Sequence, residues 1–221
     1  MGEAMKSFKE IKDIVLIKSG DYHGCGQQTP EDTIFIAELL EKEKPNTILE
    51  IGTGGGQFTT LLALMSKKVI TVDQIINKVP FWQDIINKGK IEKEDVDITQ
   101  VKGSSQIETT ANKVKGKYDL VFIDADHSWE GGLADWRLYS PMAKSVIGIH
   151  DTINYSNKHG QGWDWFPTEF WAAIKSDGSF KTEEVDPDKD IGGGWGVIYL
   201  KDGDLEKINK IIESIEKEKN G

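Results

Sequence analysis

Short apolar segments alternate with helical segments along almost the whole chain. Strand-like apolar segments are expected at residues 46–52, 67–73, 95–103, 118–126, 145–151, 181–185 and 194–201. Helical patterns lie before, between and after them, at residues 31–44, 56–66, 80–89, 105–115, 128–140, 165–176 and 204–219. This alternation is typical of a doubly wound α/β fold, in which helices cover both faces of a mostly parallel sheet. The last two strands have little helix between them, which predicts an antiparallel hairpin at one edge of a seven-stranded sheet.

The chain of 221 residues shows no linker-like segment that would divide it. We therefore expect one α/β domain over residues 31–201, with an N-terminal extension over 1–30 and a C-terminal helix over 202–221. The extension could fold back over a ligand as a lid. The first long helix has clear boundary signals, because Thr29 can cap it and Pro30 suits its first turn.

Charge and cysteine content narrow the classes of function. The formal net charge is -10 at pH 7, which argues against a surface that binds the phosphates of nucleic acids. The single cysteine, Cys25, allows no internal disulfide and suits a reducing compartment. No segment resembles a signal peptide or reaches the length of a membrane span. We expect a cytoplasmic enzyme that acts on a small molecule, without nucleic acid or membrane partners. The sequence leaves open whether the protein forms a homodimer.

A glycine-rich loop follows the first predicted strand, in NTILEIGTGGGQFTTLLALM at residues 46–65. Glycine lets a backbone turn sharply and approach a ligand closely, and such sheets bind ligands at the carboxyl ends of their strands. Asp73 ends the second strand, where its carboxylate can accept both hydroxyls of a ribose. These features predict an adenosine-type ligand, the alternative being a glycine turn without one. Gln57 stands where a dinucleotide fingerprint requires glycine, which argues against an oxidoreductase that uses NAD.

Three segments resemble one enzyme family. The loop reads Glu-x-Gly-x-Gly-x-Gly over residues 50–56, which resembles motif I of the class I S-adenosylmethionine-dependent methyltransferases. VKGSSQ, at 101–106, resembles the adenine loop of small O-methyltransferases, and FIDADHSWEG, at 122–131, resembles the fourth motif of one of their branches. The resemblance covers about residues 30–201, although the usual Pro-Gly-Gly turn before the fifth strand is missing.

The resemblance implies a Rossmann-like fold and S-adenosylmethionine as the cofactor. A carboxylate at the end of a strand suits this cationic ligand better than it suits a pyrophosphate. Small residues after the third strand leave room for adenine, and the serines there could also cap a helix. The implied cofactor contacts are Glu50, Gly52, Thr53, Gly54, Gly56, Asp73, Gln74, Ser104, Ser105, Gln106 and Asp124.

Acids and histidines gather at the ends of the fourth and fifth predicted strands. The matching positions of catechol-type O-methyltransferases hold Asp, Asp and Asn, which bind magnesium. The resemblance therefore implies a divalent cation, Mg or Mn, at Asp124, His150 and Asp151. Asp126 and His127 are close enough in sequence to join or replace a ligand. An imidazole ligand favours manganese, iron or zinc over magnesium.

A base without a metal is the second interpretation of these residues, because a hydroxyl nucleophile must lose its proton. Imidazole titrates near neutral pH, so His127 and His150 are the candidate bases, and Asp124 completes the candidate catalytic residues. A structural interpretation is the third. In that case Asp124 would contact only the cofactor's amino group, His127 would cap the helix at 128–140, and Asp151 would cap the next turn.

Tryptophan is concentrated in the second half of the chain. Trp163 and Trp165 lie in a long loop rich in Gly, Asn and aromatic residues, a composition that suits an acceptor pocket. Trp136 and Trp171 fall within predicted helices and are expected in the core. Two histidines in polar loops are expected to be solvated: His23 and His159.

The leading hypothesis is a methyltransferase that uses S-adenosylmethionine to methylate a hydroxyl of a small sugar-like or aromatic molecule, with help from a divalent metal. A metal-dependent, hydroxylase-like tailoring enzyme on the same fold and a non-catalytic cofactor-binding protein are the alternatives. A nucleic-acid methyltransferase is disfavoured because the fourth strand ends in IDADH and not in a Pro-Pro-aromatic motif. Cys25 also lacks the Pro-Cys context of enzymes that methylate base carbons.

Overall fold

The computed structural model describes residues 5–16, 28–76, 79–153, 165–186 and 193–220. The helices are α1 (Phe8–Val15), α2 (Pro30–Glu43), α3 (Gln57–Leu64), α4 (Phe81–Asn87), α5 (Glu108–Lys113), α6 (Trp129–Tyr139), α8 (Phe166–Asp177) and α9 (Asp204–Asn220). Short 3-10 turns are η1 (Lys93–Asp95) and η2 (Ser140–Met142). The strands are β1 (Thr47–Ile51), β2 (Lys68–Asp73), β3 (Ile98–Lys102), β4 (Tyr118–Ile123), β5 (Ala143–Ile153), β6 (Lys181–Glu184) and β7 (Gly193–Tyr199).

The strands form one seven-stranded sheet in the order β3-β2-β1-β4-β5-β7-β6. Strands β1 to β5 run parallel, whereas β7 runs antiparallel to both β5 and β6. The predicted doubly wound fold with an antiparallel edge is therefore confirmed. The sequence pattern did not predict α1, and β5 extends further than the expected 145–151.

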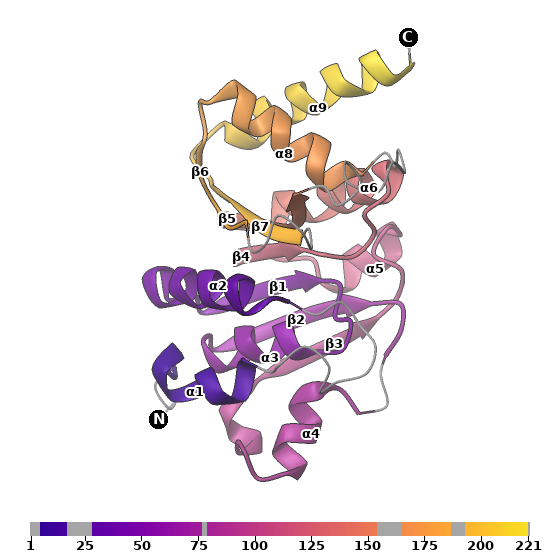
Figure 1. Ribbon diagram of the computed structural model, residues 1–221. Helices are drawn as coiled ribbons and strands as arrows, with labels where there is room; N and C mark the ends of the chain where they lie inside the picture. The colour runs from indigo at the N-terminus through magenta and orange to yellow at the C-terminus, as the bar shows by residue number, and fades with distance from the viewer. Residues whose placement is uncertain (1–4, 17–27, 77–78, 154–164, 187–192, 221) are drawn as a thin grey trace, which may run out of the picture.

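Apolar side chains leave the sheet on both faces, which explains why its strands read as nearly continuous apolar segments. Ile48 packs in the cluster that includes α1 to α4, and its neighbour Leu49 packs in the cluster that includes α5, α6, α8 and α9. Figure 1 shows α1 to α4 gathered on one side of the molecule and α6, α8 and α9 on the other. This two-layered core holds the edge formed by the strand ends in a fixed shape.

The terminal helices pack on this core. Ile11 of α1 and Ile208 and Ile212 of α9 are buried. Within the described ranges, no helix has both the length and the apolar character needed to cross a lipid bilayer.

Helix α2 begins as its sequence predicts. The backbone N–H of Asp32 donates to the Thr29 side chain, and the Asp32 carboxylate accepts from the backbone and hydroxyl of Thr29, which completes a capping box. Pro30 occupies the first turn, and Lys44 ends the helix in a left-handed conformation. The start of α2 brings Gln28, the residue before the N-cap Thr29, to the end of β4, where it contacts Asp124.

Candidate active site

A cavity of about 630 Å³ opens at the carboxyl ends of β1, β2 and β4, where the strand order reverses direction. This is where doubly wound sheets bind their ligands, and cavities of this size accommodate drug-sized molecules. All predicted cofactor contacts except Glu50 line it. The lining residues that the sequence did not predict include Gln28, Gln57, Phe58 and Ala125.

Two glycines give the first loop its shape, because a side chain would not fit at either position. Gly52 has a φ of 100°, and a Cβ there would lie 1.9 Å from the carbonyl oxygen of Asp124. Gly56 has a φ of 85°, and its Cβ would lie 2.5 Å from the ring of Trp82. The loop backbone can therefore pass close to β4 and leave room for a ligand.

Asp73 holds the glycine loop in place. Its Oδ2 accepts hydrogen bonds of 3.0 Å from the backbone N–H groups of Thr53 and Gly54, and its Oδ1 accepts one of 2.8 Å from Ile75. A carboxylate offers about four acceptor sites, so Asp73 can still accept from a ribose. The same side chain can thus shape the loop and contact a ligand.

Glu50 lies beneath the loop and not in the cavity lining. It is fully buried, its Oε2 accepts a 2.7 Å hydrogen bond from the hydroxyl of Thr59, and its Oε1 has no hydrogen-bond partner among the described residues. Burial raises the pKa of Glu50 to about 8, so its neutral form is favoured at neutral pH. Glu50 ties β1 to α3, and its direct contact with the cofactor stays a prediction.

The loop after β3 lines the cavity with both serines and Gln106. Helix α5 begins only at Glu108, with Ile107 as its N-cap and no side-chain capping bond. The alternative interpretation of Ser104 or Ser105 as a helix cap is therefore wrong. The hydroxyl of Tyr139 donates to the carbonyl of Ser105 at 2.9 Å, which anchors this loop to α6.

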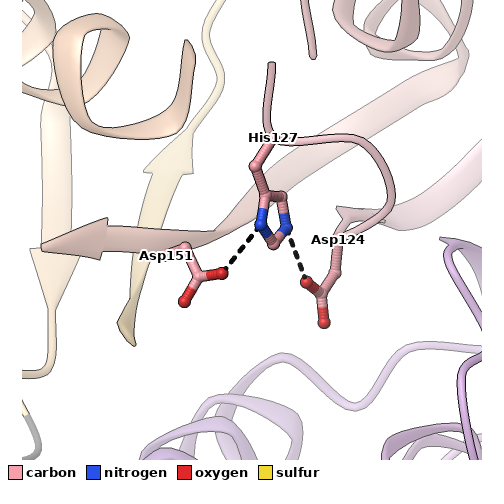
Figure 2. A group of neighbouring side chains, drawn as sticks. All are labelled: Asp124, His127 and Asp151. Carbon is pink, nitrogen blue, oxygen red and sulfur yellow. Dashed lines mark hydrogen bonds and ion pairs between the residues drawn. The ribbon is translucent and has the colours of Figure 1, made fainter. Parts of the chain in front are cut away.

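His127 lies between two carboxylates at the ends of β4 and β5, as Figure 2 shows. Its Nε2 is 3.3 Å from Oδ1 of Asp124, and its Nδ1 is 3.0 Å from Oδ2 of Asp151. Asp151 has a φ of 57°, a left-handed conformation that is uncommon outside glycine and clusters at functional sites. The cap of α6 is Ser128, whose side chain accepts from Gly131 at 3.1 Å. The interpretation of His127 as a helix cap is therefore wrong.

His150 approaches the same carboxylates from β5. Its Nδ1 is 3.1 Å from Oδ1 of Asp124 and 3.5 Å from Oδ1 of Asp151. Its Nε2 has no hydrogen-bond partner in the part of the chain that the structure describes, and Oδ2 of Asp32 lies 4.0 Å from it. The sequence thus correctly brought both histidines to one place.

A divalent cation fits the donors of this cluster. Among the described residues, Asp124, His127 and Asp151 each offer a ligand atom, and these atoms lie within 4.8 Å of one another. This group contains His127, whereas the sequence assigned the imidazole ligand to His150, and that assignment stays a prediction. Two carboxylates with one imidazole suit manganese, iron or zinc better than magnesium.

Protons balance the charge of the cluster when no cation is bound. Burial alone would lower the pKa of His127, but its hydrogen bonds to Asp124 and Asp151 outweigh burial and raise the pKa to about 10. Burial would also lower the pKa of His150, and the charge of Asp124 instead raises it well above its usual value. Burial would raise the pKa of Asp124, but the charge of His150 and the hydrogen bond to His127 hold it well below its usual value. The neighbouring carboxylates therefore favour the protonated forms of both imidazoles when no cation is bound.

The tryptophan predictions are met in part. Trp136 and Trp171 are buried in the core, as expected. Trp165 is partly buried with its ring centre 5.3 Å from that of His127, although it does not line the cavity. Four further residues singled out in the sequence lie outside the described residues: His23, Cys25, His159 and Trp163.

Comparisons with known proteins agree with this geometry. Residues 49–152 match a family model described as a methyltransferase domain. A Protein-L-isoaspartate O-methyltransferase from Flavobacterium johnsoniae is 43% identical over 53 residues, which cover 23% of this chain and 25% of that protein. The chain thus spans about a quarter of the length of this curated relative.

Solved structures share the fold over most of the chain. The O-methyltransferase from Bacillus cereus, in complex with SAH, has a TM-score of 0.60 at 16% identity and covers 88% of this chain and 90% of its own. An SAH-bound methyltransferase from Podospora anserina has a TM-score of 0.53 at 16% identity and covers 80% of each chain. The chain therefore has the Rossmann-like methyltransferase fold, and residues 49–152 match a methyltransferase domain. The matched residues 49–152 contain the glycine loop, Asp73 and the His–Asp cluster.

Proposed function

We propose that this methyltransferase methylates a hydroxyl group of a small molecule and that a divalent cation held by Asp124, His127 and Asp151 assists it. The observation that carries the proposal is a shared cavity. Asp124 and His127 line the same cavity as Gly52 and Asp73. Cation-binding and proton-accepting groups thus lie beside the loop that is expected to hold the cofactor.

The proposed reaction is a direct displacement, in which the acceptor oxygen attacks the sulfonium methyl and S-adenosylhomocysteine leaves. Its rate depends mainly on aligning oxygen, carbon and sulfur in a dry site. When bound, a divalent cation would supply the charge that lowers the pKa of the hydroxyl. Asp73 would orient the ribose, and the glycine loop would leave the backbone close to the cofactor. With the cation bound, the proton of the hydroxyl would leave to solvent. Without the cation, the neutral imidazole of His127 would accept that proton.

The proposed acceptor carries a ring, either of a sugar or of an aromatic molecule. Trp165 supports this, because its ring lies 5.3 Å from His127 and an aromatic face can pack on either kind of ring. The net charge of -10 supports a small-molecule acceptor over a nucleic acid. A cytoplasmic location and a homodimer belong to the same proposal.

Calorimetric titration of metal-free protein with S-adenosylmethionine and SAH, with and without Mn²⁺ or Mg²⁺, is the first test. We expect micromolar binding and a heat that changes when Mn²⁺ is present. A panel of catechols and sugars, with amines of matched shape, would then be screened for SAH release. Release with hydroxyl acceptors alone supports the proposal, and release with amines alone contradicts it. Oxygen consumption that depends on iron would instead support the hydroxylase-like alternative, and tight binding without turnover would support a non-catalytic cofactor-binding protein.

A further inference from the structure

A chain of hydrogen bonds runs from the antiparallel edge of the sheet to the cavity. Trp195 of β7 donates its indole N–H to Oε1 of Gln28 at 2.6 Å, and Gln28 donates from Nε2 to Oδ2 of Asp124 at 3.2 Å. Trp195 is fully buried, and both Gln28 and Asp124 line the cavity. Gln28 therefore connects a core side chain to a carboxylate of the candidate active site.

The chemistry of the two outer groups fixes the orientation of the amide between them. An indole N–H can only donate, and an ionised carboxylate can only accept. Only one orientation of the Gln28 amide satisfies both neighbours, with its oxygen toward Trp195 and its nitrogen toward Asp124. The opposite orientation would place donor against donor and acceptor against acceptor, and would leave a buried N–H without a partner, which is costly.

Both ends of this chain are held firmly. The Trp195 ring stacks on Phe58 with 4.7 Å between ring centres and lies 4.7 Å from the ring of His150. At the other end, Oδ1 of Asp124 contacts His127 and His150, while Oδ2 accepts from Gln28. The amide of Gln28 therefore helps to set the plane in which the Asp124 carboxylate faces the cavity.

We propose that Gln28 is a positioning residue for methyl transfer, whose amide, oriented by Trp195, sets the carboxylate of Asp124 at the cofactor cavity. The proposal rests on the proposed function, because it takes Asp124 as a group that contacts the cofactor. Gln28 acts through Asp124 and contributes no reacting atom. Both Gln28 and Trp195 lie outside the matched residues 49–152, so this hydrogen-bonded pair belongs to the segments that flank the matched domain.

Two substitutions test this series of hydrogen bonds, one at Trp195 and one at Gln28. Trp195→Phe keeps an aromatic ring on Phe58 but removes the N–H that orients the amide. Gln28→Met keeps the length of the side chain and removes both hydrogen bonds. Trp136→Phe is the matched control, since Trp136 is also fully buried and donates its indole N–H to an amide oxygen, Oδ1 of Asn209, at 3.0 Å. Neither Trp136 nor Asn209 lines the cavity.

The affinity for SAH and the unfolding temperature would be measured for each protein. We expect the two Trp→Phe variants to lose similar unfolding temperature. The Kd for SAH should rise about tenfold in Trp195→Phe and in Gln28→Met, as for loss of one hydrogen bond to a charged group, and stay within about twofold in Trp136→Phe. Adding Trp195→Phe to Gln28→Met should weaken SAH binding no further, because Trp195 acts through Gln28.

The indole N–H resonance of Trp195, assigned by its loss in Trp195→Phe, gives a direct readout. It should shift in Gln28→Met, and SAH should shift it in the wild type but not in that variant. If the wild type binds SAH and Gln28→Met binds it equally well, the positioning role is overturned and the methyltransferase function stands. Additive losses in the double variant would overturn the link from Trp195 to Gln28. A wild type that does not bind SAH would overturn the proposed function together with this inference.

Discussion

The two sides of the cavity hold their carboxylates in different ways. On the side of β1 and β2, Asp73 is held by three backbone N–H groups. On the side of β4 and β5, Asp124 is held by side chains, namely two imidazoles and the amide of Gln28. Backbone amides do not titrate, whereas imidazoles exchange protons and compete for cations. The first side should therefore behave as a fixed scaffold, and the second as a site whose state depends on pH and on bound metal.

Gly52→Ala should have the largest effect, because it disrupts the glycine loop at the point where its backbone lies closest to the end of β4. Its Cβ would lie 1.9 Å from the carbonyl oxygen of Asp124, at a φ of 100°. We expect SAH binding, measured by calorimetry, to weaken by more than about 100-fold, or the protein to lose its fold.

Gly203→Ala is the matched control for backbone strain. Gly203 has a φ of 84°, and its Cβ would meet no atom within 4 Å. This variant should lose about 1–2 kcal/mol of unfolding free energy in urea and bind SAH as the wild type does. Tight SAH binding by Gly52→Ala would show that close backbone approach does not define this side of the cavity.

Asp73→Ala should rank second. It removes a proposed ribose acceptor and releases the N–H groups of Thr53 and Gly54, so the Kd for SAH should rise about 100-fold. Asp119→Ala is the matched control, because Oδ2 of Asp119 also accepts two backbone N–H groups, from Asn46 at 2.8 Å and Thr47 at 3.0 Å. Asp119 does not line the cavity, so its loss should lower stability but not SAH affinity. Equal SAH affinities for the two variants would remove Asp73 from the cofactor site.

The scaffold side could be read largely from the sequence, because its signals are local. The glycines and Asp73 sit at fixed positions after β1 and β2, and parallel strand ends meet at one edge of the sheet. Because Asp124 follows β4 and Asp151 lies near the end of its parallel neighbour β5, the same argument from strand ends predicts that they lie close together. Register alone could not say which histidine would lie between them, since that depends on how the chain turns after β4.

Contacts between distant segments left no signal in the sequence. Gln28 and Trp195 are separated by most of the chain, and neither belongs to a motif that predicts a hydrogen bond to the other. Glu50 shows a different limit, because a motif position at the end of a strand predicts a ligand contact but not the direction of the side chain. The pleat of β1 turns its side chain toward Thr59, beneath the loop, and its contact with the cofactor stays a prediction. Side-chain direction is decided by packing, which a linear pattern does not contain.

The third largest effect should be the change of Mn²⁺ affinity with pH, which tests the side of β4 and β5. A cation at Asp124, His127 and Asp151 must displace a proton from His127, whose pKa is raised to about 10 by its hydrogen bonds to the two carboxylates, against the opposing effect of burial. Mn²⁺ affinity, followed by electron paramagnetic resonance, should therefore rise about tenfold per pH unit between about pH 7 and 9.

Two carboxylate variants separate the proposed ligands from their neighbour. Asp151→Asn should weaken Mn²⁺ binding strongly, because it removes a charged ligand. Asp126→Asn should change it little, since Asp126 accepts from Ser128 at 2.9 Å and is not part of the ligand group. A Mn²⁺ affinity that does not depend on pH would contradict a cation bound to His127.

The last test concerns stability, and it asks whether protons hold the cation-free cluster together. A pKa of about 10 in the folded protein, against about 6.5 in the unfolded chain, means that His127 binds its proton more tightly when folded. Its stabilisation is then complete below about pH 6.5 and is lost as the pH rises toward 10. Asp124, whose pKa is lowered, contributes stabilisation that is lost only in acid.

In the presence of a chelator, the unfolding free energy of the wild type should fall from about pH 7 to 10, and that of His127→Gln should fall less. Lysines titrate alike in both proteins, so the difference between the two curves isolates the imidazole. Parallel curves would mean that His127 is neutral in the folded protein, and the pH response of the side of β4 and β5 would then depend on His150 alone.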